Sequence, residues 1–340
     1  MTLEMAAFII GGLVLLFIGG EALVRGSVAA ARKLGVSELV IGLTLVGFGT
    51  SVPELVTSLQ AMGDGAVGIS VGNVFGSNIA NVLLVLGMAA VVCPFVTNPR
   101  AIMRDGIFMV AVTMLFAALI WFDLFTRVTG IILIVMLVVY MGGSILLDRK
   151  SNSPASVLIA DEAEAIEIHA PLWLALIMTV GGIAGVIVGA KLLVQGGSDL
   201  ARLFGISETV IGLSIVAIGT SLPELVTSVM SALKGKADVA LGNVIGSNIF
   251  NILGIMGVTA TVYPFTVRTP TGDGVAVADS VMGASVVSVQ DLVALAVSVI
   301  LLVVFAFTGR KIGRVEGGIL LFGYAAFMAL TFGLVPGFGD

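Results

Sequence analysis

Two glutamates interrupt long apolar segments of this chain, and each directly follows a proline. Glu54 lies in GFGTSVPELVTS and Glu224 lies in AIGTSLPELVTS. A carboxylate among apolar residues is costly and usually faces a partner or a wet cavity, yet no Lys or Arg lies in these segments or in the apolar segments that follow them. Pro53 and Pro223 lack an amide hydrogen and disturb the preceding helical turn, which frees backbone carbonyls. Carboxylates beside free carbonyls predict a cation site.

Helical spacing places Thr50, Ser51 and Ser58 on the face of Glu54, and Thr220, Ser221 and Ser228 on the face of Glu224. The following segments carry polar residues four positions apart: Asn73, Ser77 and Asn81, then Asn243, Ser247 and Asn251. Taken singly, a Ser or Thr of this kind often only joins two membrane helices. As a set, without Cys or His, they form an all-oxygen environment that suits hard ions such as Ca²⁺ and Na⁺ and not soft metals.

The composition indicates which elements hold these residues. The chain is 58% apolar and only 11% charged, with a mean hydropathy of +1.18, whereas a soluble domain has about a quarter charged residues. A spanning helix needs roughly 20 apolar residues. Ten stretches qualify, near 5–24, 39–62, 68–92, 106–122, 128–147, 172–194, 209–233, 237–262, 291–308 and 317–335. We therefore predict an all-α membrane protein with ten transmembrane helices, whose partner is the lipid bilayer, without nucleic acid or an obligate protein partner.

The chain also repeats itself. Between residues 37 and 81, 25 of 45 positions are identical to the residues 170 positions later. Each half holds five predicted spans, and an odd number means that the second copy enters the membrane from the opposite side, as in many secondary transporters. The predicted organisation is a first five-helix repeat over 1–147, a linker over 148–170 and a second, inverted repeat over 171–340.

Basic residues predict the orientation of these spans. With the N-terminus outside, twelve of the 16 Lys and Arg residues fall on the inner side, as positive charges do in membrane proteins. Both termini are then outside. The inner linker carries an acidic run from Asp161 to Glu167, read as a solvated linker, and His169. The loop over 266–290 is longer than its counterpart in the first half and is read as a loose outer loop.

The paired G-T-S-x-P-E and G-N-x-x-G-S-N-I-x-N motifs resemble those of the cation/Ca²⁺ exchanger superfamily, specifically its prokaryotic Na⁺/Ca²⁺ exchanger branch, over nearly the whole chain. The resemblance implies a secondary antiporter of the cytoplasmic membrane that exchanges Na⁺ for Ca²⁺ by alternating access, with Ca²⁺ and Na⁺ as transported ions and no cofactor. It also implies the ion ligands: Glu54, Glu224, Thr50, Ser51, Ser77, Asn81, Thr220, Ser221, Ser247 and Asn251, with the carbonyls of Gly47 and Ala217.

Two positions depart from patterns found in this superfamily. Some members carry an acid at the position of Asn251. This chain has a neutral amide there, so its two glutamates alone give the centre a formal charge of −2. That charge balances one Ca²⁺, whereas three Na⁺ would leave +1. The H⁺/Ca²⁺ branch typically has a glutamate where this chain has Gly76 and Gly246, which argues against proton coupling.

Other functions are distinguishable on the same residues. An H⁺/Ca²⁺ antiporter, or one for another divalent cation, is the alternative within transport. A channel needs a continuous selective pore, whereas here carboxylates lie in interrupted midplane segments. An intramembrane enzyme needs a nucleophile with a base or a metal-binding His pair; the sequence has no HExxH motif and no Ser–His arrangement, so we expect no enzyme.

Overall fold

The computed structural model describes residues 3–65, 67–96, 99–150, 171–204, 217–267, 289–308 and 311–331. These residues are almost entirely helical, and one short antiparallel pair joins β1 (Phe95–Val96) to β2 (Lys311–Ile312). Among them, eight helices are long and apolar enough to span a membrane, and one bent helix pair adds a ninth. The predicted all-helical, multi-span fold is therefore confirmed. The predicted span over 209–233 is described only from Ala217 onward, so ten spans and their inverted arrangement remain predictions.

The helices of the first half are α1 (Leu3–Leu34), α2 (Glu38–Ile41), α3 (Gly47–Thr50), α4 (Val52–Gly63), α5 (Val67–Ala80), α6 (Gly87–Val92), α7 (Pro99–Trp121) and α8 (Arg127–Lys150). Those of the second half are α10 (Leu172–Leu203), α12 (Ala217–Thr220), α13 (Leu222–Leu233), α14 (Ala237–Phe250), α15 (Met256–Val262), α16 (Val289–Thr308) and α17 (Arg314–Thr331). Three π-helical stretches connect them: η1 (Gly42–Val46), η2 (Asn81–Leu86) and η5 (Asn251–Ile255). Most of the predicted linker over 148–170 lies outside the described residues. Almost all of the loop over 266–290 lies outside them too.

Two spans form the centre of the molecule. Every residue in the most apolar window of Ala237–Val262 is buried, and 78% of the window in Val67–Val92 is buried. The corresponding share is only 11% for Arg314–Thr331 and 17% for Arg127–Asp148, and apolar side chains such as Val138 and Phe322 are exposed there. Because exposed apolar surface needs an apolar solvent, the outer helices face lipid and the two central spans are shielded from it.

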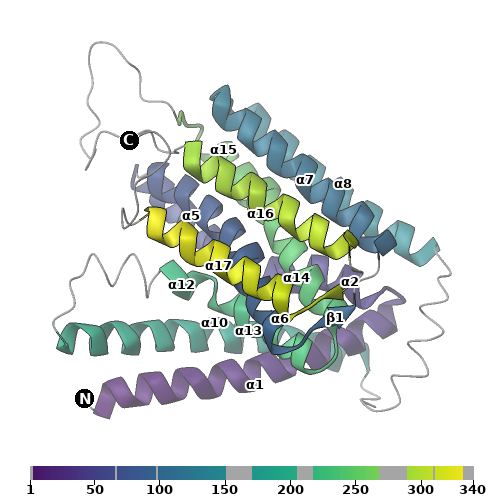
Figure 1. Cartoon of the computed structure of the whole chain (residues 1–340), viewed down its shortest axis with the longest axis vertical. Coiled ribbons are helices and arrows are strands. Elements are labelled where there is room, and N and C mark those ends of the chain that lie inside the picture. The colour runs from purple at the N-terminus through teal and green to yellow at the C-terminus, as the bar shows by residue number, and fades with distance from the viewer. Residues whose placement is uncertain are drawn as a thin grey trace.

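Helices α1 and α10 lie side by side along one edge of the molecule (Figure 1). A Cβ at Gly12 would lie 2.8 Å from the carbonyl oxygen of Gly189, and one at Gly26 would lie 2.8 Å from that of Ala175. The two helices are therefore antiparallel and in contact through their backbones. Small residues permit such an approach in membranes, where packing and not water drives helix association.

Helix α1 is longer than the apolar stretch that predicts it. The stretch ends near residue 24, whereas the helix continues to Leu34 and is about 48 Å long at 1.5 Å per residue. In its last turns Ala29 and Ala30 pack on Ala175 of α10, while Arg25 and Arg32 are exposed. Hydropathy measures suitability for lipid, so it misses a helical end held by contact with another helix.

The close contact between α1 and α10 at Gly182 predicts that Gly182→Ala destabilises the protein. Its Cβ would overlap the backbone of Leu23 in α1, and overpacking of this kind costs about 1–3 kcal/mol. The matched control is the neighbouring Gly181→Ala, whose Cβ meets nothing within 4 Å in the described part of the chain. The thermal unfolding midpoint of the detergent-purified protein should fall for Gly182→Ala and stay level or rise for Gly181→Ala. Equal midpoints for the two variants would contradict the close contact.

Candidate cation site

Each glutamate lies where a helix is broken. In the first half the helical segment Glu38–Thr50 ends at Ser51, and α4 leaves at an angle of 43°. Pro53 occupies the first turn of α4 and cannot donate to the preceding turn. Glu54 follows in that same first turn, where the positive end of the helix dipole favours an anion. The break therefore exposes backbone oxygens and also places a carboxylate beside them.

The second half repeats this geometry. Helix α12 ends at Thr220, Ser221 has nearly the same backbone angles as Ser51, and Pro223 and Glu224 begin α13. Both glutamate side chains are buried, with 1% of their surface exposed. The hydroxyl of Ser51 donates to Oε1 of Glu224 at 3.0 Å. This hydrogen bond joins the broken segment of one half to the carboxylate of the other.

An asparagine on each following helix holds the start of each glutamate-bearing helix. The Nδ2 atom of Asn73 donates to the carbonyl of Glu54 at 3.1 Å and to the hydroxyl of Ser58 at 2.9 Å. In the second half, Nδ2 of Asn243 donates to the carbonyl of Glu224 at 3.3 Å and to the hydroxyl of Ser228 at 3.0 Å. Residues 170 positions apart thus make the same contacts, as a structural repeat requires.

Four further asparagines meet in pairs between the central spans. The Nδ2 atom of Asn251 donates to Oδ1 of Asn78 at 3.2 Å, and that of Asn81 donates to Oδ1 of Asn248 at 3.5 Å. All four side chains are buried. Because the amide nitrogens of Asn81 and Asn251 are used in these bonds, their oxygens are left to point elsewhere. Asn81 and Asn251 also begin the π-helical stretches η2 and η5, a feature frequent at functional sites.

Ten buried side-chain oxygen atoms have no hydrogen-bond partner within the described residues, and six of them are Ser or Thr hydroxyls. The other four belong to carboxyl or amide groups: Oε2 of Glu54, Oε2 of Glu224, Oδ1 of Asn81 and Oδ1 of Asn251. Leaving a buried acceptor without a partner costs about 1–3 kcal/mol, and more for a charged group. Each of these four oxygens can accept from a hydrogen-bond donor or coordinate a cation. Two carboxylates and two amide oxygens are a donor set for a hard cation.

The structure gives the other predicted ligands different surroundings. Thr50 donates to Oδ1 of Asn243 at 3.1 Å, and the hydroxyl of Ser247 donates to the carbonyl of Gly47 at 3.2 Å. Ser77 and Ser221 are buried, and Thr220 is half-buried beside the second break. The Gly47 carbonyl also accepts a hydrogen bond from Ser51 N at 3.3 Å. In this conformation its oxygen is therefore already hydrogen-bonded within the protein. Ala217 begins α12 directly after residues outside the described part.

Sequence reasoning missed Asn78 and Asn248, which orient the amides of Asn81 and Asn251. Both were visible as the second-last polar residue of the G-N-x-x-G-S-N-I-x-N motif. Their contacts cross from one half of the chain to the other, so helical spacing within one segment could not reveal them. The Nδ2 atom of Asn248 in turn lies 3.6 Å from the sulfur of Met109.

Comparison with known proteins gives consistent matches over the whole chain. The family model described as sodium/calcium exchanger protein matches residues 5–146 and 174–333. A putative antiporter, CaxA, of Alkalimonas amylolytica is 36% identical over 96% of this chain and 98% of its own length. The sodium/calcium exchanger MaX1 of Methanosarcina acetivorans is 34% identical, over 94% of this chain and 96% of its own. The solved structure of the sodium-calcium exchanger NCX_Mj, soaked without Na⁺ and Ca²⁺, aligns with a TM-score of 0.79 at 31% identity, over 97% of this chain and 100% of that one.

The asparagine pairs predict that Asn248→Ala weakens cation binding as well as stability. Loss of its Oδ1 leaves Nδ2 of Asn81 without an acceptor, which costs about 1–3 kcal/mol, and lets the Asn81 oxygen turn away from the glutamates. The measurement is the unfolding midpoint without and with Ca²⁺, where the Ca²⁺-induced rise should shrink. Met109→Leu is the matched control, because it conserves volume and removes only a weak sulfur acceptor. A full Ca²⁺-induced rise in Asn248→Ala would contradict the role given to this residue.

Proposed function

The chain belongs to the sodium/calcium exchanger family of multi-pass membrane transporters, and on that premise we propose that it exchanges Na⁺ for Ca²⁺ across the cell membrane. Family membership confirms the resemblance carried by the paired motifs and gives cation antiport as the activity. The coupling to Na⁺, the ligand set and the outer position of both termini belong to the proposal.

One observation supports the proposal above the rest. Four buried oxygens, from Glu54, Glu224, Asn81 and Asn251, lack donors among the described residues. In a membrane interior such atoms have no water to satisfy them. The described ion pairs use other residues, and none of them reaches either glutamate. A transported cation supplies the missing positive charge and is itself held by oxygens in place of its hydration shell.

We assign the two carboxylates as ligands shared by all bound cations. Thr50, Ser51, Ser77, Thr220, Ser221 and Ser247 are the flanking oxygen ligands, with the carbonyls of Gly47 and Ala217 at the ends of the site and Asn81 and Asn251 at its centre. Use of the Gly47 carbonyl requires its bond from Ser247 to open. That exchange of partners couples ion binding to movement of α14 relative to the first broken segment.

Competition for the same oxygens makes this site an exchanger. Both glutamates together carry −2, which one Ca²⁺ neutralises, and Na⁺ ions can replace it only by taking the same oxygens. A cation therefore leaves on one side when the other cation displaces it. If carboxylates are exposed to one side at a time, as in alternating access, the two ions move in opposite directions.

Proton coupling is the second candidate, and a specific observation disfavours it. Gly76 and Gly246 lie where the H⁺/Ca²⁺ branch of the superfamily has glutamate. A Cβ at Gly246 would overlap the carbonyl of Leu43 in η1, so a longer side chain cannot be added there without moving a helix. A Cβ at Gly76, by contrast, would meet nothing within 4 Å among the described residues, so the steric argument applies to Gly246 alone.

The test of the proposed function is ⁴⁵Ca²⁺ uptake into proteoliposomes loaded with Na⁺, K⁺ or acid. Uptake should require an outward Na⁺ gradient and should be lost when Na⁺ is equal on both sides. Uptake driven by acid inside would replace Na⁺ with H⁺ as the coupling ion. Uptake into K⁺-loaded vesicles at the same rate as into Na⁺-loaded ones would reject Na⁺-coupled exchange.

The site assignment predicts that Glu54→Gln and Glu224→Gln each reduce Na⁺-driven Ca²⁺ uptake to background. The substitution conserves size but leaves −1 to face a divalent ion at low dielectric, where charge balance is expensive. Glu316→Gln is the control, since that acid lies in the first turn of α17 and accepts from Gly313 N. Unfolding midpoints without added ions verify that the variants are folded. Near-normal uptake in either site variant would reject the assignment.

Asn251→Asp tests the charge at the centre. The Asn251 amide donates to Asn78 and offers an oxygen to the site, and a neutral carboxylic acid can do both, whereas a carboxylate cannot donate. Two nearby glutamates make a third negative charge costly, so we expect the neutral form and a nearly unchanged Na⁺ concentration for half-maximal Ca²⁺ release. A tenfold drop in that concentration, about 1.4 kcal/mol, would mean that the new acid is ionised and that Asn78 has turned its unpartnered Nδ2 toward it.

A further inference from the structure

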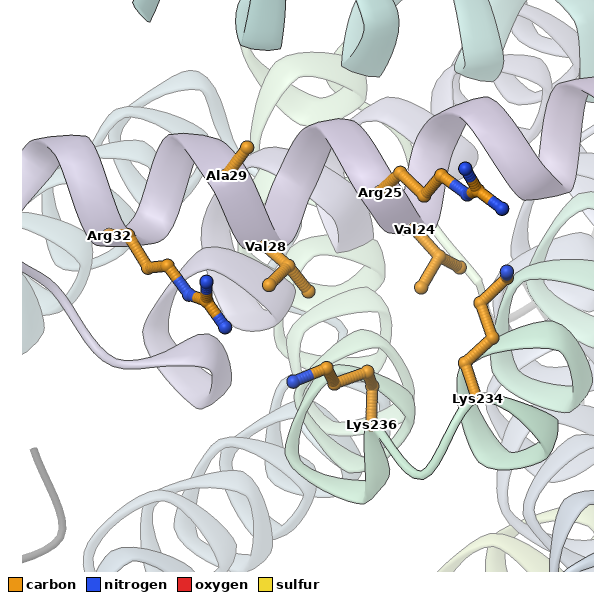
Figure 2. A pocket seen from close by; sticks show the side chains of 7 residues that line it. All are labelled: Val24, Arg25, Val28, Ala29, Arg32, Lys234 and Lys236. Atoms are coloured by element: carbon orange, nitrogen blue, oxygen red, sulfur yellow. The ribbon is translucent and has the colours of Figure 1, made fainter. Parts of the chain in front are cut away.

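A basic hollow lies between the last turns of α1 and the turn that joins α13 to α14 (Figure 2). It is lined by Val24, Arg25, Val28, Ala29, Arg32, Lys234 and Lys236. In Figure 2 the amine of Lys236 points toward the guanidinium of Arg32, and the amine of Lys234 points toward Arg25. The four cations therefore form two pairs, one at each end of the hollow, and each pair joins α1 to the α13–α14 turn.

The nearby carboxylates do not balance these charges. Glu21 pairs with both Arg25 and Lys234, the latter at 2.6 Å, and Glu38 pairs with Lys236 at 2.9 Å. The guanidinium of Arg32 has no acid partner among the described residues. Even when Asp238, in the first turn of α14, is added to the two glutamates, four positive charges face three negative ones.

The two lysines are also largely withdrawn from water. Their side chains are 17% and 15% exposed for Lys234 and Lys236. Each lysine has a glutamate partner, so the cation that lacks an acid partner among the described residues is Arg32, which the Lys236 amine faces. An anion placed between Arg32 and Lys236 would reduce the repulsion between these like charges, and a planar guanidinium is well suited to the oxygens of a phosphate.

The depth of the hollow matches the level of lipid headgroups. Ten residues of helix separate Glu224 from Lys234, which is about 15 Å along the axis. That is half of a hydrocarbon core about 30 Å thick, so the hollow lies at the membrane surface when Glu224 lies near the midplane. Ile18 lies seven residues and Val14 eleven residues before Arg25, so both share its face of α1, and they are 58% and 49% exposed. Acyl chains can lie along that stripe while a headgroup occupies the hollow.

The repeat in the sequence provides an internal comparison. The positions 170 residues from Arg25, Arg32, Lys234 and Lys236 hold Gln195, Arg202, Asp64 and Ala66. Only one of the four cations recurs, so the shared packing of the two halves does not demand them. Membrane proteins carry an excess of basic residues on the inner side. That excess explains on which side of the membrane these four cations lie, but not why all four line one hollow.

We propose that this hollow binds the phosphate of an anionic phospholipid of the inner leaflet, with Arg32 and Lys236 as its main contacts. Basic pockets between transmembrane helices bind anionic headgroups in this way. The bound phosphate joins the end of α1 to the end of α13, the helix that begins with Glu224. The lipid is therefore part of the packing that holds α1 in place, beyond its role as solvent.

The experiment measures the unfolding midpoint of the full chain in neutral detergent, titrated with short-chain phosphatidylglycerol. Short-chain phosphatidylcholine and inorganic phosphate are titrated in parallel, the first for lipid without net charge and the second for phosphate without lipid. We expect a saturable rise with phosphatidylglycerol alone. An equal rise with phosphatidylcholine would overturn anion recognition, and an equal rise with inorganic phosphate would overturn the lipid in favour of a free anion.

Variants locate the effect in the hollow. Arg32→Gln should raise the phosphatidylglycerol concentration for half-maximal effect at least tenfold, and it leaves no carboxylate without its partner, so the fold should persist. Arg32→Lys, which keeps the charge but loses the planar fork, should have an intermediate effect. Lys33→Gln is the matched control, because Lys33 is the adjacent exposed cation of α1 and does not line the hollow. A wild-type titration for Arg32→Gln, or an equal loss in Lys33→Gln, would overturn the proposal.

Discussion

The burial of two carboxylates without a basic partner among the described residues is the constraint on which the rest of this structure depends. Glu54 and Glu224 are shielded by the two central spans, and a buried charge is tolerated only where other groups stabilise it. The surrounding structure meets that need in parts: helix starts at the two breaks, a hydroxyl from Ser51, and asparagines that secure each helix start. It leaves four carboxyl and amide oxygens of Glu54, Glu224, Asn81 and Asn251 without a partner among the described residues, and the proposed cation would be held by them.

Much of this centre could be predicted from the sequence because its signals are local. A charge inside an apolar segment, a proline beside it and a repeat at a fixed offset are all readable along the chain. They single out Glu54 and Glu224, which the structure buries in the first turns of α4 and α13. Asn78 and Asn248 were not, because their contacts join opposite halves and depend on which helix faces which. The bond from Ser247 to the Gly47 carbonyl is of the same kind. Side-chain type was predictable, whereas partner choice required the tertiary arrangement.

The fold shows the same division. Apolar stretches near 68–92 and 237–262 predict the central spans Val67–Val92 and Ala237–Val262 almost to the residue, since lipid-compatible composition and helix length coincide there. Apolar composition and helix length do not coincide for α1, because its last turns are fixed by alanine contact with α10 and carry arginines. These turns also form one wall of the basic hollow. Features that lie at the membrane surface depend on contacts between helices, and hydropathy alone does not record them.

The choice of asparagine at both central positions has an electrical consequence. With both glutamates ionised and no third acid, the proposed site carries −2, so its Ca²⁺-loaded form is neutral. A membrane potential acts on moving charge with about 2.3 kcal/mol per elementary charge per 100 mV, and it therefore exerts no net force on the centre when Ca²⁺ is bound. A centre holding three Na⁺ would carry +1 and would feel that potential. In such a transporter the voltage sensitivity of the whole cycle resides in the Na⁺ half, and two uncharged amides determine that it does.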